Sequence, residues 1–308
     1  MKKLYVYLAS ISFLFYFSGC KKEVMNIADY YQEASVHSDD QARFSSEIDA
    51  VANDVNFAIE MEPGMTGKPA NFLAAICDAD IVTDTLSNPR TITINYNGNT
   101  CNANYKRTGK VIVSMDANTR WNNAGAKINV SFVNFKVVRL KDSKDMVFNG
   151  KVLFTNVSGS LLGDLASVST VTQTIFSDDI DILFDNGKDW SWKTFRKRVY
   201  REDNGIVITT TGLQPMGGIS GVCDWGNNRL GHPFLTPVLS PLVNRQDCNF
   251  RVVSGKTEII ITDHLYATCN LGLDESGSPI SCPGTSSYWF EVIWRDPIGT
   301  RCVLRLPY

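Results

Sequence analysis

The sequence contains very few histidines and no excess of charge of either sign. Only 3 of its 308 residues are histidine, which leaves little material for histidine-based catalysis or a histidine-rich metal site. Lys and Arg number 30 against 32 Asp and Glu, a formal net charge of -2. Proteins that bind nucleic acid usually present a strongly basic face. We therefore expect no metal, no other cofactor and no nucleic-acid partner.

Familiar catalytic motifs are also missing. The sequence contains no HExxH, no Walker A and no GxGxxG pattern. The segment 218–222 lacks the last glycine of a nucleophile elbow. His232 and His264 enter a Ser/His/Asp arrangement only if their partners are chosen freely. We expect a protein that is not an enzyme, and an extracytoplasmic hydrolase with an unrecognised carboxylate site is the weakest of three functional hypotheses.

The N-terminus has the pattern of a lipoprotein signal peptide. Lys2 and Lys3 precede an uncharged apolar run over 4–17, which is too short to span the ~30 Å hydrocarbon core of a membrane. Two small residues then lead directly into Cys20, as in a bacterial lipobox, although Phe17 replaces the usual aliphatic residue. We expect removal of residues 1–19 and acylation of Cys20, with palmitate among its chains. An ordinary secretory peptide is the alternative.

The residues after Cys20 indicate the destination. Lys21, Lys22 and Glu23 follow, without the Asp that retains many lipoproteins at the inner membrane. We expect a lipid anchor in the outer membrane, since several acyl chains give stable attachment. The periplasmic and cell-surface sides both remain open.

Seven further cysteines fit an exported protein. None lies in a CxxC pattern, and an oxidising compartment favours disulfides. An odd number means that at least one stays free or pairs between chains. Cys77 with Cys101 is the pair we expect first, because the two flank one strand–turn–strand unit. The disulfide candidates are Cys77, Cys101, Cys223, Cys248, Cys269, Cys282 and Cys302.

One amphipathic helix is predicted before a long β-region. Residues 20–37 show no clear period and are interpreted as a membrane tether that leaves His37 in solvent. Residues 38–70 are predicted to hold the helix and a linker, with Ser38 as its N-cap. A helical spacing of apolar residues predicts the face that packs on the β-region: Phe44, Ile48, Val51, Val55 and Ile59.

Residues 71–308 change to a period of two. The fold class is therefore mainly β, a large antiparallel meander forming either a sandwich or an open barrel. Whether it is one domain or two stays open. The clearest strand signals are 91–96, 110–115, 127–137, 148–154, 168–176, 206–211, 256–261 and 288–294. Hairpin turns are predicted at the pairs 97–98, 108–109, 149–150, 186–187 and 254–255, each ending in glycine.

Several short segments carry a family resemblance. They are Cys77, 88–94, Cys101, 107–113, 130–135, 192–198 and 226–231. Taken together, they are similar to a widespread family of Bacteroidota lipoproteins for which no activity is known. The resemblance runs from about residue 20 to the C-terminus. It implies an anchored, β-rich protein and transfers no catalytic residue.

An acidic segment at 177–189 precedes a basic one at 190–201. The order of ligands in an EF-hand is absent, so a calcium site is disfavoured. We predict a hairpin across 186–187 with complementary charges on its two strands.

The basic strand also supplies the candidate ligand site. Alternation places two tryptophans, two arginines and a tyrosine on one face, and a glycine-rich loop adds two more residues. Such a surface suits sugar rings with acidic groups. The preferred interpretation is instead that the tryptophans pack between sheets, with the arginines lying over them in cation–π contacts. The residues are Trp190, Trp192, Arg196, Arg198, Tyr200, Trp225 and Arg229.

These features favour a membrane-anchored envelope lipoprotein that binds a glycan or another envelope protein. A structural or assembly component of the envelope, without a small ligand, is the alternative.

The lipid anchor can be tested at Cys20. In the native host, Cys20→Ser is expected to abolish metabolic labelling with a palmitate analogue and to move the protein from the membrane to the soluble fraction, because the acylated thiol is gone. Cys302→Ser is the matched control and should keep both properties. Unchanged labelling of Cys20→Ser would exclude this anchor.

Overall fold

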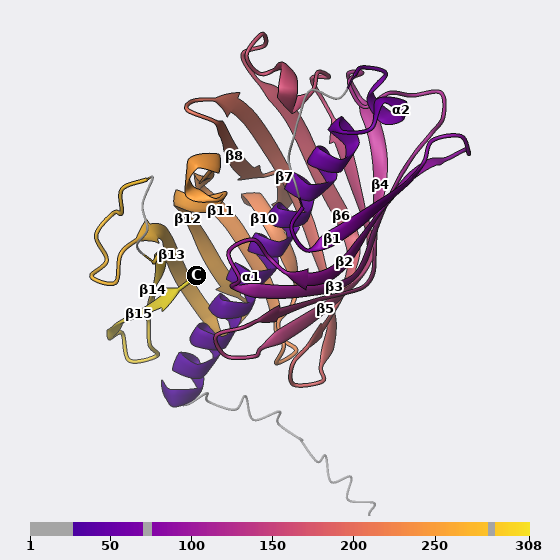
Figure 1. Ribbon diagram of the computed structural model, residues 1–308. Coiled ribbons are helices and arrows are strands. Elements are labelled where there is room, and N and C mark those ends of the chain that lie inside the picture. The colour runs from indigo at the N-terminus through magenta and orange to yellow at the C-terminus, as the bar shows by residue number, and fades with distance from the viewer. Residues whose placement is uncertain (1–26, 70–75, 283–286) are drawn as a thin grey trace, which may run out of the picture.

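A computed structural model describes residues 27–69, 76–282 and 287–308. It shows one curved antiparallel sheet of 15 strands, with a long helix, α1 (Ile27–Glu60), along its concave face (Figure 1). A short helix, α2 (Pro63–Thr66), follows α1. Two single-turn 3-10 helices, η1 (Leu162–Asp164) and η2 (Gln246–Cys248), lie between strands. The prediction of a mainly β antiparallel meander preceded by a helix is confirmed.

The sheet follows the chain order closely. Strands β1 to β7 are neighbours in sequence and in space, and the path then continues from β10 to β15. Strand β8 pairs with β7 and β11, and β9 pairs with β10. The bounds are β1 (Ala79–Asp84), β2 (Arg90–Asn99), β3 (Tyr105–Met115), β4 (Ala126–Arg139), β5 (Asp145–Asn156), β6 (Val171–Phe184), β7 (Asp189–Glu202), β8 (Ile206–Gly212), β9 (Gln214–Met216), β10 (Ile219–Asn227), β11 (Pro233–Arg245), β12 (Arg251–Ile261), β13 (Leu265–Leu273), β14 (Trp289–Arg295) and β15 (Arg301–Pro307). The β-region is therefore one continuous sheet rather than a two-sheet sandwich.

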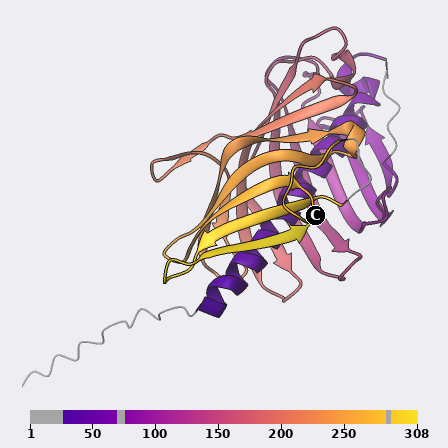
Figure 2. The same cartoon turned by 90° about the vertical axis from the view of Figure 1, so that its left-hand side faces the viewer.

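Helix α1 fills the hollow of this sheet. Both views place it between the early strands and the C-terminal strands (Figures 1 and 2). The apolar face predicted for the helix is buried in full: Phe44, Ile48, Val51, Val55 and Ile59. Polar residues from other sides of the helix are buried as well, for example Glu47 and Asn53. The helix is covered on most sides because the sheet curls around it.

The predicted start of this helix is wrong. The helix begins at Ile27, so residues 27–37 are not a tether. Ser38 is not an N-cap, since its hydroxyl donates to the Ala34 carbonyl at 2.5 Å inside the helix. His37 is buried rather than solvated, with 1% of its surface exposed. Because the wrapped helix buries polar side chains too, its N-terminal part shows no apolar period.

The N-terminal expectations are only partly covered by the structure. Residues 1–26, including Cys20, lie outside the described residues. Within the described part, no helix has the length and hydropathy needed to cross a membrane.

Most of the predicted glycine turns are wrong. Only the pair 186–187 connects two strands, β6 and β7. The glycines of the other four pairs lie inside strands β2, β3, β5 and β12. Gly109 has a φ of 94°, and a Cβ there would lie 2.1 Å from the Asn134 carbonyl oxygen of β4. Gly150 meets Asp179 of β6 in the same way. Gly109 and Gly150 thus allow the backbone of the neighbouring strand to approach closely at points where the strand pairing is irregular.

The irregularities explain the curvature of the sheet. The β3–β4 register shifts between Thr108 and Lys110, and the β4–β5 register shifts between Phe132 and Phe135. Asn134, between the last two, has a left-handed φ of 48°. Bulges bend a strand and increase its twist. A row of them across adjacent strands allows the sheet to curl around α1.

Two disulfides are present among the described residues. Cys77–Cys101 is confirmed, and it joins the segment before β1 to the turn between β2 and β3. Cys248–Cys282 is the second. The free thiols in the described part of the chain are Cys223 and Cys269, which are buried, and Cys302, which is partly exposed.

The close approach at Gly109 gives a stability prediction. Gly109→Ala is expected to lower the free energy of unfolding by at least about 1–3 kcal/mol, because alanine is strained at this φ and its Cβ collides with β4. Urea denaturation measures the loss. Gly98→Ala is the matched control within β2, where the nearest atom to a new Cβ lies at 3.6 Å, and it should be nearly neutral. Equal stability of the two variants would contradict this explanation.

Candidate functional site

The ligand face predicted on β7 is covered by α1. Alternation along the strand is as predicted, and the even-numbered residues face inward. Trp192, Arg196, Arg198 and Tyr200 are each 0% exposed. Trp190 is partly buried and packs against the same core. The four fully buried side chains contact the helix, and no ligand reaches them without displacing it.

Arg196 is held between a helix and a neighbouring strand. Its Nη2 donates to Asp224 Oδ2 of β10 at 2.6 Å, and its Nη1 lies 3.4 Å from Asp49 Oδ1 of α1. Gln41 of α1 donates to the same Asp224 oxygen at 2.6 Å. Burial disfavours the charge of Arg196, yet Asp224 and Asp49 keep its pKa above the ordinary value for arginine. The guanidinium group of Arg196 is therefore held by partners within the protein.

Further arginines of the sheet repeat this contact with α1. Arg198 Nη2 donates to Asn53 at 3.0 Å and lies over the ring of Tyr200. Four ion pairs join α1 to the sheet or, for Arg229, to the loop after β10, and we call them the arginine ladder: Arg107–Asp54 at 2.9 Å, Arg139–Asp39 at 2.5 Å, Arg196–Asp49 at 3.4 Å and Arg229–Asp40 at 2.6 Å. The ladder runs along much of the helix.

The complementary charges predicted within the β6–β7 hairpin do not pair. The hairpin forms, but Arg196 lies opposite Ile175 and Arg198 opposite Gln173. The buried arginines of β7 use carboxylates of α1 and β10 instead. The preferred interpretation is correct for the burial of Trp192 but wrong for the arginines, which lie over other rings than tryptophan. Arg196 is 5.9 Å from the centre of the Phe44 ring and Arg198 is 5.2 Å from that of Tyr200.

The two residues expected on the glycine-rich loop do not complete a ligand surface either. Trp225 lies within β10 instead, and only Arg229 lies in the loop that follows it. Trp225 pairs with Lys193 and lies on the opposite face of the sheet from Asp224. Arg229 is bound by Asp40 and Asp185, each at 2.6 Å, and lies over the ring of Phe184. The seven predicted residues therefore divide between the interior, the outer face and an ion-pair cluster.

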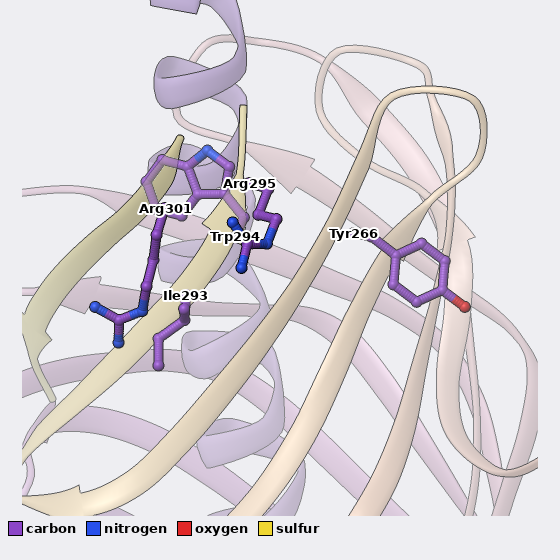
Figure 3. A pocket seen from close by; sticks show the side chains of 5 residues that line it. All are labelled: Tyr266, Ile293, Trp294, Arg295 and Arg301. Carbon is purple, nitrogen blue, oxygen red and sulfur yellow. The ribbon is translucent and has the colours of Figure 1, made fainter. Parts of the chain in front are cut away.

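An exposed depression lies elsewhere, on the outer face of the C-terminal strands (Figure 3). It has a volume of about 350 Å³ and is lined by Tyr266 of β13, Ile293, Trp294 and Arg295 of β14, and Arg301 of β15. Tyr266 is 60% exposed. Arg295 and Arg301 are direct partners across the β14–β15 ladder.

The charge in this depression is not neutralised. Both arginines are exposed, and no ion pair within 4.0 Å involves either of them among the described residues. Arg295 Nη1 donates to the Gly299 carbonyl at 2.9 Å. Like charges directly opposite each other destabilise a ladder, and a carboxylate or sulfate bound there would relieve that repulsion. The phenol ring of Tyr266 adds an apolar surface with a polar tip.

Sequence reasoning did not find this depression. It is built from two arginines that flank the turn between β14 and β15 and a tyrosine on the preceding strand, β13. The alternation of Tyr266, Ile293 and Arg295 on outward positions was a usable signal, but the pairing register was needed to bring them together.

No family model, curated protein or solved structure matches this chain.

His37, packed beside Trp192, gives a prediction about pH. Its ring lies 4.5 Å from that of Phe234, and burial lowers its pKa to about 3. Below pH 6.5 the unfolded chain gains a proton on this histidine while the folded chain does not, so folding stability falls as the pH drops toward 3.

His37→Phe removes this dependence. At pH 7.5 the two proteins should differ by packing alone. At pH 5, about 1.5 units below the pKa of the unfolded chain, the variant should gain about 2 kcal/mol relative to that difference. Urea denaturation at both pH values measures it. Parallel pH profiles of the two proteins would show that His37 can be protonated in the fold.

Proposed function

We propose that this chain is an outer-membrane lipoprotein that binds acidic glycans through the depression at Tyr266, Arg295 and Arg301. The signal pattern before Cys20 and the resemblance to Bacteroidota lipoproteins support the anchor. Disulfides at Cys77–Cys101 and Cys248–Cys282 fit an oxidising compartment. The proposed role is binding and not catalysis.

The observation that carries this proposal is the pair of unneutralised arginines beside an exposed aromatic ring. Guanidinium groups recognise carboxylates and sulfates through paired N–H donors. An aromatic ring offers a face on which a sugar ring can stack. The depression is shallow and open, which suits a segment of a long polysaccharide. The curved sheet holds the three side chains on adjacent, hydrogen-bonded strands.

A structural or assembly role is the second candidate, and the edge strand β1 favours it. In the described part of the chain, β1 pairs only with β2. Its Val82 is 61% exposed. An unpaired edge can add a strand from a partner, but β1 has only 6 residues and includes Asp80 and Asp84, which makes it a weak template.

The test is retention of the full chain, purified in detergent, on immobilised polyuronate, sulfated and neutral polysaccharides. We expect retention on an acidic polysaccharide, and Arg295→Gln with Arg301→Gln should reduce it at least tenfold because both anion donors are lost. Lys127→Gln with Lys151→Gln is the control, since it removes the same charge from exposed positions on other strands.

Retention lost only in the arginine variant supports the proposal. No retention on any acidic polysaccharide, or equal loss in both variants, excludes a glycan site in this depression and favours the assembly role. Circular dichroism checks that all variants are folded.

A further inference from the structure

Two of the three histidines converge on one buried carboxylate. Glu33 lies in the N-terminal half of α1, His232 immediately precedes β11, and His264 lies in the β12–β13 turn. His232 Nδ1 is 2.6 Å from Glu33 Oε1, and His264 Nδ1 is 3.9 Å from Glu33 Oε2. One ligand atom from each residue lies within 4.8 Å of the other two. We call these residues the His–Glu cluster.

The carboxylate of this cluster is incompletely satisfied. The Glu33 side chain is only 2% exposed. Its Oε1 accepts a hydrogen bond from Asn228 Nδ2 at 2.7 Å in addition to the contact with His232. Its Oε2 is buried and has no hydrogen-bond partner. A buried acceptor without a partner costs free energy, and a cation at this position removes that cost.

We propose that the His–Glu cluster binds a divalent transition metal, with Zn²⁺ as the best fit. Two imidazoles and one carboxylate are established zinc ligands, at about 2.0–2.2 Å from the metal. In a tetrahedral site the ligand atoms then lie about 3.3 Å apart. The two contacts of Glu33, at 2.6 and 3.9 Å, lie on either side of that separation. Metal binding also requires the two stacked imidazole rings to tilt apart, so that the ion lies in the plane of each ring.

The surroundings leave room for a fourth ligand. The side chains of His232 and His264 are 32% and 30% exposed, so one side of the cluster faces solvent and water can complete the coordination. Their rings stack at 3.8 Å with an interplanar angle of 14°. Nitrogen and oxygen ligands of this kind select zinc and its neighbours over calcium or magnesium.

Asn228 is the positioning residue of the site. Its amide nitrogen holds Glu33, while its side-chain oxygen accepts from the backbone N–H groups of Leu230 and His232. It thereby fixes the carboxylate and the loop that carries one histidine. Groups of this kind hold metal ligands in the orientation that binding requires.

The metal has a structural consequence. It joins α1 to the loop before β11 and to the turn after β12, which are three separate parts of the chain. The other group of potential ligands in the described residues contains Cys248 and Cys282, and their disulfide withdraws both from metal binding. The proposal is independent of glycan binding, because the His–Glu cluster and the depression share no residue.

The experiment uses the full chain in detergent, stripped with a chelator and titrated with Zn²⁺ by calorimetry. We expect one equivalent to bind and the Tm to rise. Co²⁺ then serves as a spectroscopic probe, with visible d–d bands of nitrogen and oxygen ligation and no thiolate charge-transfer band.

The variants address two of the three ligands and the positioning residue. Glu33→Gln and His264→Ala should each abolish stoichiometric binding and the rise in Tm. Asn228→Ala should weaken binding roughly 10- to 100-fold. Glu275→Gln removes an exposed carboxylate, and Cys302→Ser removes the most accessible free thiol. Both controls should bind like the unmodified chain.

Three outcomes overturn the proposal. One is an unmodified chain that binds no Zn²⁺ and gives no Co²⁺ bands. Another is binding that Glu33→Gln leaves unchanged. The third is a thiolate band that disappears in Cys302→Ser, which would place the metal at a cysteine. The titrations of the unmodified chain keep the test decisive even if a variant fails to fold.

Discussion

The pairing of sheet arginines with helix carboxylates is the interaction on which the rest of this structure depends. Each pair of the arginine ladder removes two charges from water, and the attraction offsets that cost only when both partners are in place. Removing one partner of such a pair typically costs about 3–5 kcal/mol. The ladder therefore fixes where α1 lies along the sheet. Burial of the apolar face stabilises the contact between helix and sheet, and the ion pairs determine the position of the helix along the sheet.

Curvature of the sheet makes this pairing geometrically possible. A flat sheet would contact a helix along one stripe only. Here the bulges opposite Gly109 and Gly150 bend successive strands, and the sheet reaches around the helix far enough to cover its polar sides. The inward-facing aromatic and basic side chains of β7 pack against the helix. The concave face therefore binds α1 and is closed to other ligands.

Because α1 covers the concave face, the side chains that remain accessible to a ligand lie on the outer face and at the rim of the sheet. The depression at Arg295 and Arg301 lies on outward positions of β13, β14 and β15, where α1 does not reach. The His–Glu cluster lies where α1 meets two loops, and its histidines stay partly exposed. The two arginines of the depression are exposed to solvent, whereas Glu33 of the cluster has a buried carboxylate oxygen without a partner in the described structure. A buried group of this kind calls for an explanation, while the paired arginines of the ladder are explained by stability.

The sequence by itself determined what depends on near neighbours. Alternation predicted the strands and assigned the residues of β7 to the correct two faces, helical spacing predicted the apolar face of α1, and the flanking positions of Cys77 and Cys101 predicted their disulfide. The tertiary structure alone decided which of those faces is covered. One partner of Arg196, Asp49, lies 147 residues away, and Glu33 lies 199 residues from His232. Gly109 and Gly150 lie within strands rather than in turns, because the backbone of a neighbouring strand approaches them closely. Local periodicity carries no information about such distant contacts, which is why β7 was considered as a ligand face and the His–Glu cluster was not expected at all.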